Sequence, residues 1–319
     1  MKNNDLDKVV EDALLVIQEE GMFERFNGYA EKIIANINNK TFEPMKRKNR
    51  YGLQSYINID NARKNKPEIS LRYLGQEVAR LDSSLNVTPK DQQKFNPSFL
   101  WKSNEGTRFR KFYRDLLDFD LHSQEHKDEF LILTEMGKTK GKYKSLIQIQ
   151  PIKIDHSLRV QFPVGINAKG ANSKGNIDIL SRVRRGAISN IAVIELKNSE
   201  SYLKQSDGID QAIRYAVFLR ELLRSPESVS KVEWITILGF KPSRFEKPMT
   251  FYATLMVPLY HQSHALVLLS KYGTPNDYAT YIFPNGDKIQ VSSLYYTQKN
   301  ECIQIAEVNC INEVKLNSF

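Results

Sequence analysis

Residues 175–222 constrain the fold of this chain more than any other stretch. Residues 177–183 and 191–197 have the apolar, β-branched composition of strands, and a short polar turn separates them. An amphipathic helix is predicted over residues 209–223, with its core-facing stripe formed by Ile209, Ala212, Ile213, Ala216, Leu219 and Leu223. Two strands followed by a helix of this kind indicate a mixed α/β core.

Three charged residues interrupt these apolar runs. Asp178 lies inside the first run, and the second ends abruptly in Glu195-Leu196-Lys197. Side chains alternate along a strand, so Glu195 and Lys197 share a face, and strand pairing would bring Asp178 toward Glu195. Two adjacent carboxylates repel each other unless a proton or a cation lies between them, and Mg²⁺ prefers oxygen ligands. A salt-bridge cluster at the strand ends is the alternative.

Gln211 and Tyr215 are four residues apart on the predicted helix, at the edge of its apolar stripe. Both side chains carry hydrogen-bonding groups, which could orient a bound water, a phosphate or Lys197. An ordinary Gln–Tyr pair on the flank of a helix explains the same spacing.

Together these features resemble the PD-(D/E)XK nuclease superfamily, over residues 99–240. That family has a strand with Asp, a hairpin, a strand ending in Glu-x-Lys and then a helix. The matching stretches here are "GNIDIL", "IAVIELKN" and "DQAIRYA", and Gln-x-x-x-Tyr is similar to the RecB-type branch, many of whose members are exonucleases. Ile177 stands where the family often has proline. The resemblance implies a restriction-endonuclease-like mixed sheet flanked by helices.

The resemblance also implies metal-assisted phosphodiester hydrolysis. Asp178, Glu195 and the carbonyl of Leu196 would bind one or two Mg²⁺ or Mn²⁺ ions. Lys197 would orient the attacking water or offset developing negative charge. Gln211 would align the site, and Tyr215 would support it.

The family often carries a further glutamate on its first core helix. Glu105 in "NEGTRFRKFYRDLL" is the candidate here, and Glu135 is the second choice. Either is otherwise an ordinary exposed glutamate, or an acid that complements a helix dipole.

Basic residues favour a polyanionic partner. The net charge is +9 and the isoelectric point is about 9.3, which suits a phosphate backbone, although solubility alone explains such a charge equally well. We expect two groups of cations to contact phosphate groups. They are Arg182, Arg184 and Arg185 after the Asp178 strand, and Lys138, Lys140, Lys142 and Lys144 at a hairpin tip. The alternative is that these cations lie in solvated loops. The Gly-Lys-Thr at 137–139 is not part of a P-loop. That motif needs another glycine five residues before the Gly-Lys pair, and residue 132 is isoleucine.

The remaining chain divides into three expected parts. Residues 1–97 read as a helical and β-hairpin lobe, residues 98–245 as the nuclease-like core, and residues 246–319 as a β-rich extension packed on that core. Helices are predicted over 5–38 and after Ser103, a hairpin over 69–87 and another around 284–287. Further strands are predicted at residues 130–133, 146–154, 159–164 and 232–240.

Taken with the resemblance, the sequence predicts a metal-dependent DNA nuclease. Such an enzyme would act in restriction, in another form of antiviral defence or in DNA repair. A non-catalytic nucleic-acid-binding module on the same fold is the alternative, and an interaction protein is a third class. Two cysteines, Cys302 and Cys310, form no disulfide framework, so we expect reduced thiols in the cytoplasm. No apolar stretch is long enough to predict a membrane span. Endonuclease or exonuclease action, a homodimer and a partner protein stay open.

Overall fold

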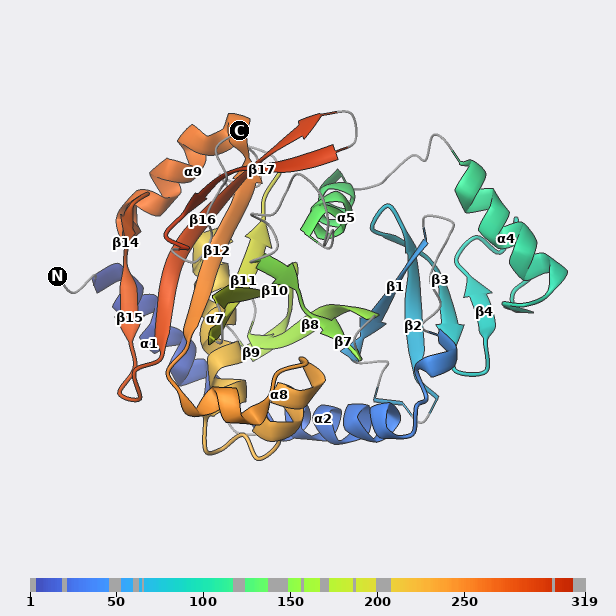
Figure 1. Ribbon diagram of the computed structural model, residues 1–319, viewed down its shortest axis with the longest axis horizontal. Coiled ribbons are helices and arrows are strands. Elements are labelled where there is room, and N and C mark those ends of the chain that lie inside the picture. Colours follow the sequence, from blue (N-terminus) through green and yellow to red (C-terminus); the bar gives the residue numbers. More distant parts are fainter. Residues whose placement is uncertain are drawn as a thin grey trace.

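The computed structural model describes residues 4–18, 22–45, 53–59, 63–64, 66–116, 124–136, 149–155, 158–166, 172–185, 188–198, 208–299 and 302–311. These residues form a mixed α/β structure with two large sheets (Figure 1). The helices are α1 (Asn4–Ile17), α2 (Met22–Asn38), α4 (Asn104–Asp115), α5 (Gln124–Met136), α7 (Gly208–Arg224), α8 (Lys231–Ile237) and α9 (Gln262–Leu269). None of them, within the described residues, is long and apolar enough to cross a bilayer.

The first sheet, here the N-terminal sheet, has the strand order β5-β4-β3-β2-β1-β8-β7, and β9 pairs with β8. Its strands are β1 (Leu53–Asn58), β2 (Glu68–Tyr73), β3 (Gln76–Asp82), β4 (Asn86–Pro89), β5 (Phe99–Leu100), β7 (Lys153–Ile154), β8 (Leu158–Ile166) and β9 (Asn172–Ile177). The β2–β3 hairpin confirms the prediction for residues 69–87, with Gly75 in the turn at φ +85°. β8 adds to β1 in parallel, so strands far apart in sequence share this sheet.

The second sheet, here the central sheet, has the order β15-β16-β12-β11-β10-β6, and β17 pairs with β16. Its strands are β6 (Ile149–Pro151), β10 (Ile179–Arg185), β11 (Ile188–Leu196), β12 (Thr250–Pro258), β15 (Thr280–Ile282), β16 (Lys288–Lys299) and β17 (Cys302–Asn309). β10 and β11 are antiparallel, whereas β11, β12 and β16 are parallel. The domain boundary expected at residue 245 therefore falls between two neighbouring strands of one sheet.

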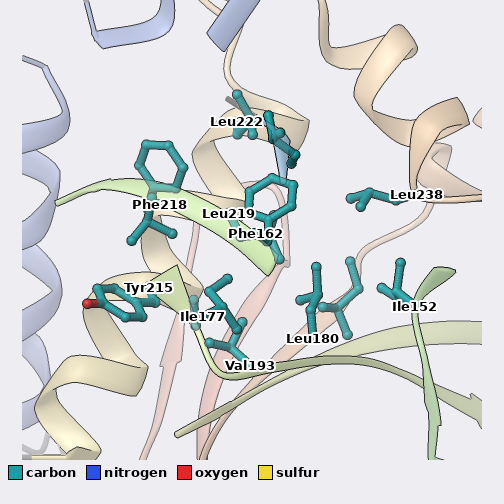
Figure 2. Packing of buried hydrophobic residues seen from close by; sticks show 14 of the residues in the cluster. Ile152, Phe162, Ile177, Leu180, Val193, Tyr215, Phe218, Leu219, Leu222 and Leu238 are labelled. Atoms are coloured by element: carbon teal, nitrogen blue, oxygen red, sulfur yellow. The ribbon is translucent and has the colours of Figure 1, made fainter. Parts of the chain in front are cut away.

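Both faces of β11 are buried. Ile191 and Val193 face the cluster that contains α7, and Ile194 and Leu196 face a second cluster that contains apolar residues of α5. Figure 2 shows Val193 among residues from α7 and from strands of both sheets. A strand covered on both faces reads as a continuous apolar run, which explains why Ile191-Ala192-Val193-Ile194 does not alternate with polar residues.

Two predicted strands are helices in the structure. Residues 130–133 lie in α5, and most of 232–240 lies in α8. A short apolar run looks the same in a buried strand and on a buried helix face, so periodicity could not separate them. The helix after Ser103 is confirmed as α4, whose Gly106 N–H donates to the Ser103 hydroxyl. The 284–287 hairpin turn is confirmed between β15 and β16.

The strand predicted over residues 177–183 is broken at its charged residue. β9 ends at Ile177, Asp178 is a bend, and β10 begins at Ile179. Because β9 pairs with β8 and β10 pairs with β11, the chain passes from the N-terminal sheet to the central sheet at Asp178.

Candidate functional site

The Asp178 side chain reaches the end of β11. Its Oδ2 accepts a hydrogen bond of 2.9 Å from the backbone N–H of Leu196, and the carboxyl group is partly buried. The residues on either side of Leu196 are Glu195 and Lys197. The break between the two sheets therefore places Asp178 beside both charged residues predicted from the sequence.

Glu195 and Lys197 form a buried ion pair. The distance from Lys197 Nζ to Glu195 Oε1 is 2.6 Å. Lys197 is 8% exposed and Glu195 is 1% exposed. Gly208, at the start of α7, packs against the Lys197 stem, where a Cβ would lie 3.3 Å from Lys197 Cγ. Glu195 Oε2 is buried and, among the described residues, has no hydrogen-bond donor.

The cluster carries more acid than base. Burial raises the pKa of Asp178, although the Lys197 charge and the Leu196 N–H oppose this rise. Burial and the Asp178 carboxylate raise the pKa of Glu195 well above its usual value. Burial disfavours the charged form of Lys197, but the carboxylates of Glu195 and Asp178 outweigh it and raise the Lys197 pKa. One ammonium thus faces two carboxyl groups, and a proton or a cation is needed to balance them.

Two glutamates of α5 extend this acidic cluster. Burial and the Asp178 charge raise the pKa of Glu125, and they raise the pKa of Glu129 to about 8. Neither residue is predicted from the sequence, because the apolar run at residues 130–133 predicts a strand there. Their spacing of four residues places both on one side of a helix, and this signal becomes readable only once α5 is known to be helical.

Glu105 does not lie in this cluster. It belongs to α4, and its Oε1 accepts a 3.1 Å hydrogen bond from the Asn96 backbone N–H. Figure 1 shows α4 at one end of the molecule, with strands of the N-terminal sheet between it and β11. Glu135, the second choice, is buried near the C-terminal end of α5.

Gln211 and Tyr215 of α7 lie next to the cluster. Gln211 Nε2 donates to the Tyr215 hydroxyl at 3.2 Å. Tyr215 is 2% exposed, and its pKa is raised first by burial and then by the Glu195 carboxylate. Gly175 of β9 provides the space for this hydroxyl, because a Cβ there would lie 2.4 Å from it. Figure 2 shows Tyr215 in the core, beside Ile177.

The predicted phosphate-contacting residues have different outcomes. Arg182 donates to the carbonyl oxygens of Leu238 and Gly239, at 3.1 and 2.8 Å, and its guanidinium lies over the Phe240 ring. Its charge thus joins β10 to the end of α8. The backbones of Arg184 and Arg185 belong to β10, but their side chains lie outside the described part, as do Lys138, Lys140, Lys142 and Lys144.

The oxygen atoms of this cluster are of the type that hard divalent cations prefer as ligands. Within the described residues, no group of three His, Cys, Asp or Glu side chains has metal-binding geometry. Mg²⁺, however, is commonly held by one or two carboxylates together with substrate phosphates and waters. Asp178, the donor-free Oε2 of Glu195 and the carbonyl of Leu196 could supply such a set.

Comparisons with known proteins found no match. No family model, no curated protein and no solved structure matches this chain.

Proposed function

We propose that this protein is a metal-dependent nuclease that hydrolyses DNA phosphodiester bonds on a restriction-endonuclease-like core. The observation that carries the proposal is the hydrogen bond from the Leu196 N–H to Asp178, which joins Asp178 to the Glu195–Lys197 pair. Two carboxylates and an ammonium in one buried cluster are costly unless a function needs them.

Each residue has a role that follows from its position. Asp178 and Glu195, with the Leu196 carbonyl, would hold Mg²⁺ or Mn²⁺, and the bound cation would stabilise negative charge on a phosphoryl group. Lys197, fixed by Glu195, would donate to the attacking water or to a phosphoryl oxygen. Gln211 and Tyr215 would keep this ammonium and the carboxylates aligned.

The α5 glutamates would tune this cluster. Glu125 and Glu129 lie close enough to Asp178 for its charge to raise their pKa values. In the absence of a cation, ionisation of either glutamate would add to the repulsion around Asp178, and their raised pKa values reflect that cost. A divalent cation would relieve that repulsion, so the acid surplus supports cation binding.

The net charge of +9 supports DNA as the partner, and restriction, other antiviral defence or DNA repair in the cytoplasm as the setting. A non-catalytic DNA-binding module is the second candidate. It is favoured by the 2.6 Å ion pair, because a Glu195 carboxylate neutralised by Lys197 is also a stable structural arrangement.

One assay separates these candidates. Linear duplex, circular duplex and single-stranded DNA, and an RNA of the same sequence, are incubated with the protein and Mg²⁺, Mn²⁺ or EDTA. We expect cleavage of DNA with a divalent cation and none with EDTA. Cleavage that persists in EDTA would overturn the metal-dependent mechanism, and DNA binding without cleavage under both metals would favour the second candidate. Cleavage of linear but not circular DNA identifies an exonuclease.

A further inference from the structure

One face of the N-terminal sheet is polar and lies toward α5. β1, β2 and β8 pair so that Tyr56 is next to Ser70 on one side and Arg159 on the other. Arg159 donates to Thr134 of α5 at 3.3 Å, and Gln54 donates to the same hydroxyl at 3.2 Å. The opposite face is apolar and packs with α2. The polar face is thus turned toward the helix that carries Glu125 and Glu129.

Three cations form a row across this face, here the cation row: Lys153 of β7, Arg159 of β8 and Arg72 of β2. Lys153 is directly opposite Arg159 in the antiparallel β7–β8 pair. The guanidinium groups of Arg159 and Arg72 both lie against the Tyr56 ring, at 5.6 and 4.4 Å from its centroid. The cation row therefore runs from the edge of the sheet to a buried arginine.

The partners of the two arginines are neutral. Arg72, which is 9% exposed, donates to Gln161 Oε1 at 2.6 Å and to the Ser70 hydroxyl. Arg159 donates to the hydroxyls of Tyr56 and Thr134. Among the described residues, no carboxylate forms an ion pair with any member of the cation row.

Such an arrangement is costly without an anion. Like charges directly opposite each other in an antiparallel pair destabilise a sheet, and a buried cation is normally paired with an anion. Partial loss of hydration and the Arg159 charge lower the pKa of Lys153, as expected for two cations held together. Elsewhere in this sheet, cations are paired with a carboxylate. Glu77 of β3 forms ion pairs with Arg80 of the same strand and with Lys90, which directly follows β4.

The cation row adjoins the candidate site. Glu129 is affected by the charges of Asp178, Arg72 and Arg159, and His126 by those of Arg72 and Asp178. Because Glu129 has a pKa of about 8, it is mostly protonated at neutral pH and does not neutralise the arginines. The cation row and Asp178 thus act on the same residues of α5.

We infer that Lys153 and Arg159, supported by the charge of the buried Arg72, form a binding track for the DNA phosphate backbone beside the bond that is cleaved. The planar fork of arginine matches phosphate oxygens, and a row of cations along one face suits a chain of phosphodiesters rather than a single small anion. This inference rests on the proposed function for the position of the cleaved bond. The binding track itself is tested without cleavage.

The test measures binding in a Glu195→Gln background, so that no substrate is consumed. Anisotropy of a fluorescein-labelled duplex of roughly 30 base pairs is followed in EDTA, between about 50 and 200 mM salt. Arg72→Gln, Arg159→Gln and Lys153→Gln are compared with Lys32→Gln, which removes an exposed charge from α2 on the other side of the sheet. We expect each variant of the cation row to weaken binding by about 3- to 10-fold and to reduce the salt slope by about one. Lys32→Gln should stay within about 2-fold of its parent, as expected for a charge away from the contact.

Two arms keep the result decisive. Circular dichroism reports whether loss of a buried arginine unfolds the protein. Lys153 is exposed, so Lys153→Gln tests the inference even in that case. Equal affinities of Lys153→Gln and Lys32→Gln for DNA would overturn the inference. It would also be overturned if the cation-row variants weakened binding of polyglutamate but left binding of DNA unchanged. If wild-type protein never cleaves DNA but the variants still lose affinity, the proposed nuclease activity fails and the binding track stands.

Discussion

Asp178 Oδ2 lies 2.9 Å from the Leu196 backbone nitrogen, and this hydrogen bond connects the bend between two sheets to the last residue of a buried strand. Asp178 is thereby held beside Glu195 and Lys197, although its own strand pairing is broken at that residue. The geometry depends on a backbone donor, so the carboxyl position is kept even when its charge is removed.

Asp178→Asn should abolish most activity without unfolding the protein. An asparagine Oδ1 can still accept the Leu196 N–H, but its neutral amide no longer supplies an anionic oxygen. We expect the DNA cleavage rate in Mg²⁺ to fall by about 100-fold or more. The exposed Asp277→Asn on β14 (Asp277–Tyr278) is the control. Wild-type cleavage rates in Asp178→Asn would contradict its role.

Lys197→Met should destabilise the fold in a pH-dependent way. The change leaves the buried Glu195 carboxylate without its cation beside Asp178, a loss of about 3–5 kcal/mol near neutral pH. Because the folded-state pKa of Glu195 is raised, the penalty is absent below the usual pKa and grows as the pH rises. Urea unfolding at acidic and neutral pH measures this difference. Adding Glu195→Gln should restore much of the stability, and no recovery would mean that lost packing, rather than charge, is responsible.

Glu129 predicts how wild-type stability depends on pH. Its pKa is 4.5 when unperturbed and about 8 in the folded protein, so the folded form binds the proton more tightly. The stabilisation from this proton is fully present below about pH 4.5 and is lost as the pH rises to about 8. The free energy of unfolding is expected to decrease by about 2 kcal/mol over this pH range. This is less than the full pKa shift would give, because the Glu129 side chain is only partly buried. Thermal unfolding of Glu129→Gln should show a flatter profile, whereas Glu246→Gln should keep the wild-type slope.

Divalent cations should stabilise the protein independently of any cleavage. A cation that binds only the folded form at 100 times its dissociation constant adds about 2.7 kcal/mol. Mg²⁺ or Mn²⁺ should therefore raise the melting temperature of the wild type, but not that of Asp178→Asn or Glu195→Gln. Equal shifts in all three proteins would place the cation elsewhere.

Gly175→Ala should disturb Tyr215. The new Cβ would lie 2.4 Å from the Tyr215 hydroxyl and 2.8 Å from the Ile166 carbonyl oxygen, so we expect a loss of about 1–3 kcal/mol in unfolding free energy. Tyr215→Phe in the same chain removes the clashing hydroxyl and should recover part of that loss. Gly28→Ala on α2 is the matched control, because no atom beyond its chain neighbours and the nearby backbone of its own helix lies within 4 Å of its added Cβ. It should be neutral or stabilising by up to about 1 kcal/mol. Similar losses in both glycine variants would exclude the Tyr215 contact as the cause.

Local patterns predicted the elements that carry the candidate site, but not all of their surroundings. α7, β11 and the Gln211–Tyr215 pair were readable because helical periodicity and long apolar runs depend on neighbouring residues. Short apolar runs fit either element, so the pattern predicts strands at residues 130–133 and 232–240, where the structure has α5 and α8. Without the helix α5, the spacing of Glu125 and Glu129 could not be recognised. The predicted ligand Glu105 lies on α4, which strands of the N-terminal sheet separate from β11.

The sequence by itself determined that Glu195 and Lys197 lie on the same side of one strand, because alternation is a property of the chain. Only the tertiary structure decided that Asp178 is the bend between two sheets, and that Glu129 lies within reach of the charges of Asp178, Arg72 and Arg159. Glu129, Arg72 and Arg159 come from a helix and two strands that are distant in sequence. Their proximity results from burying several apolar surfaces at once, and no local pattern contains that information.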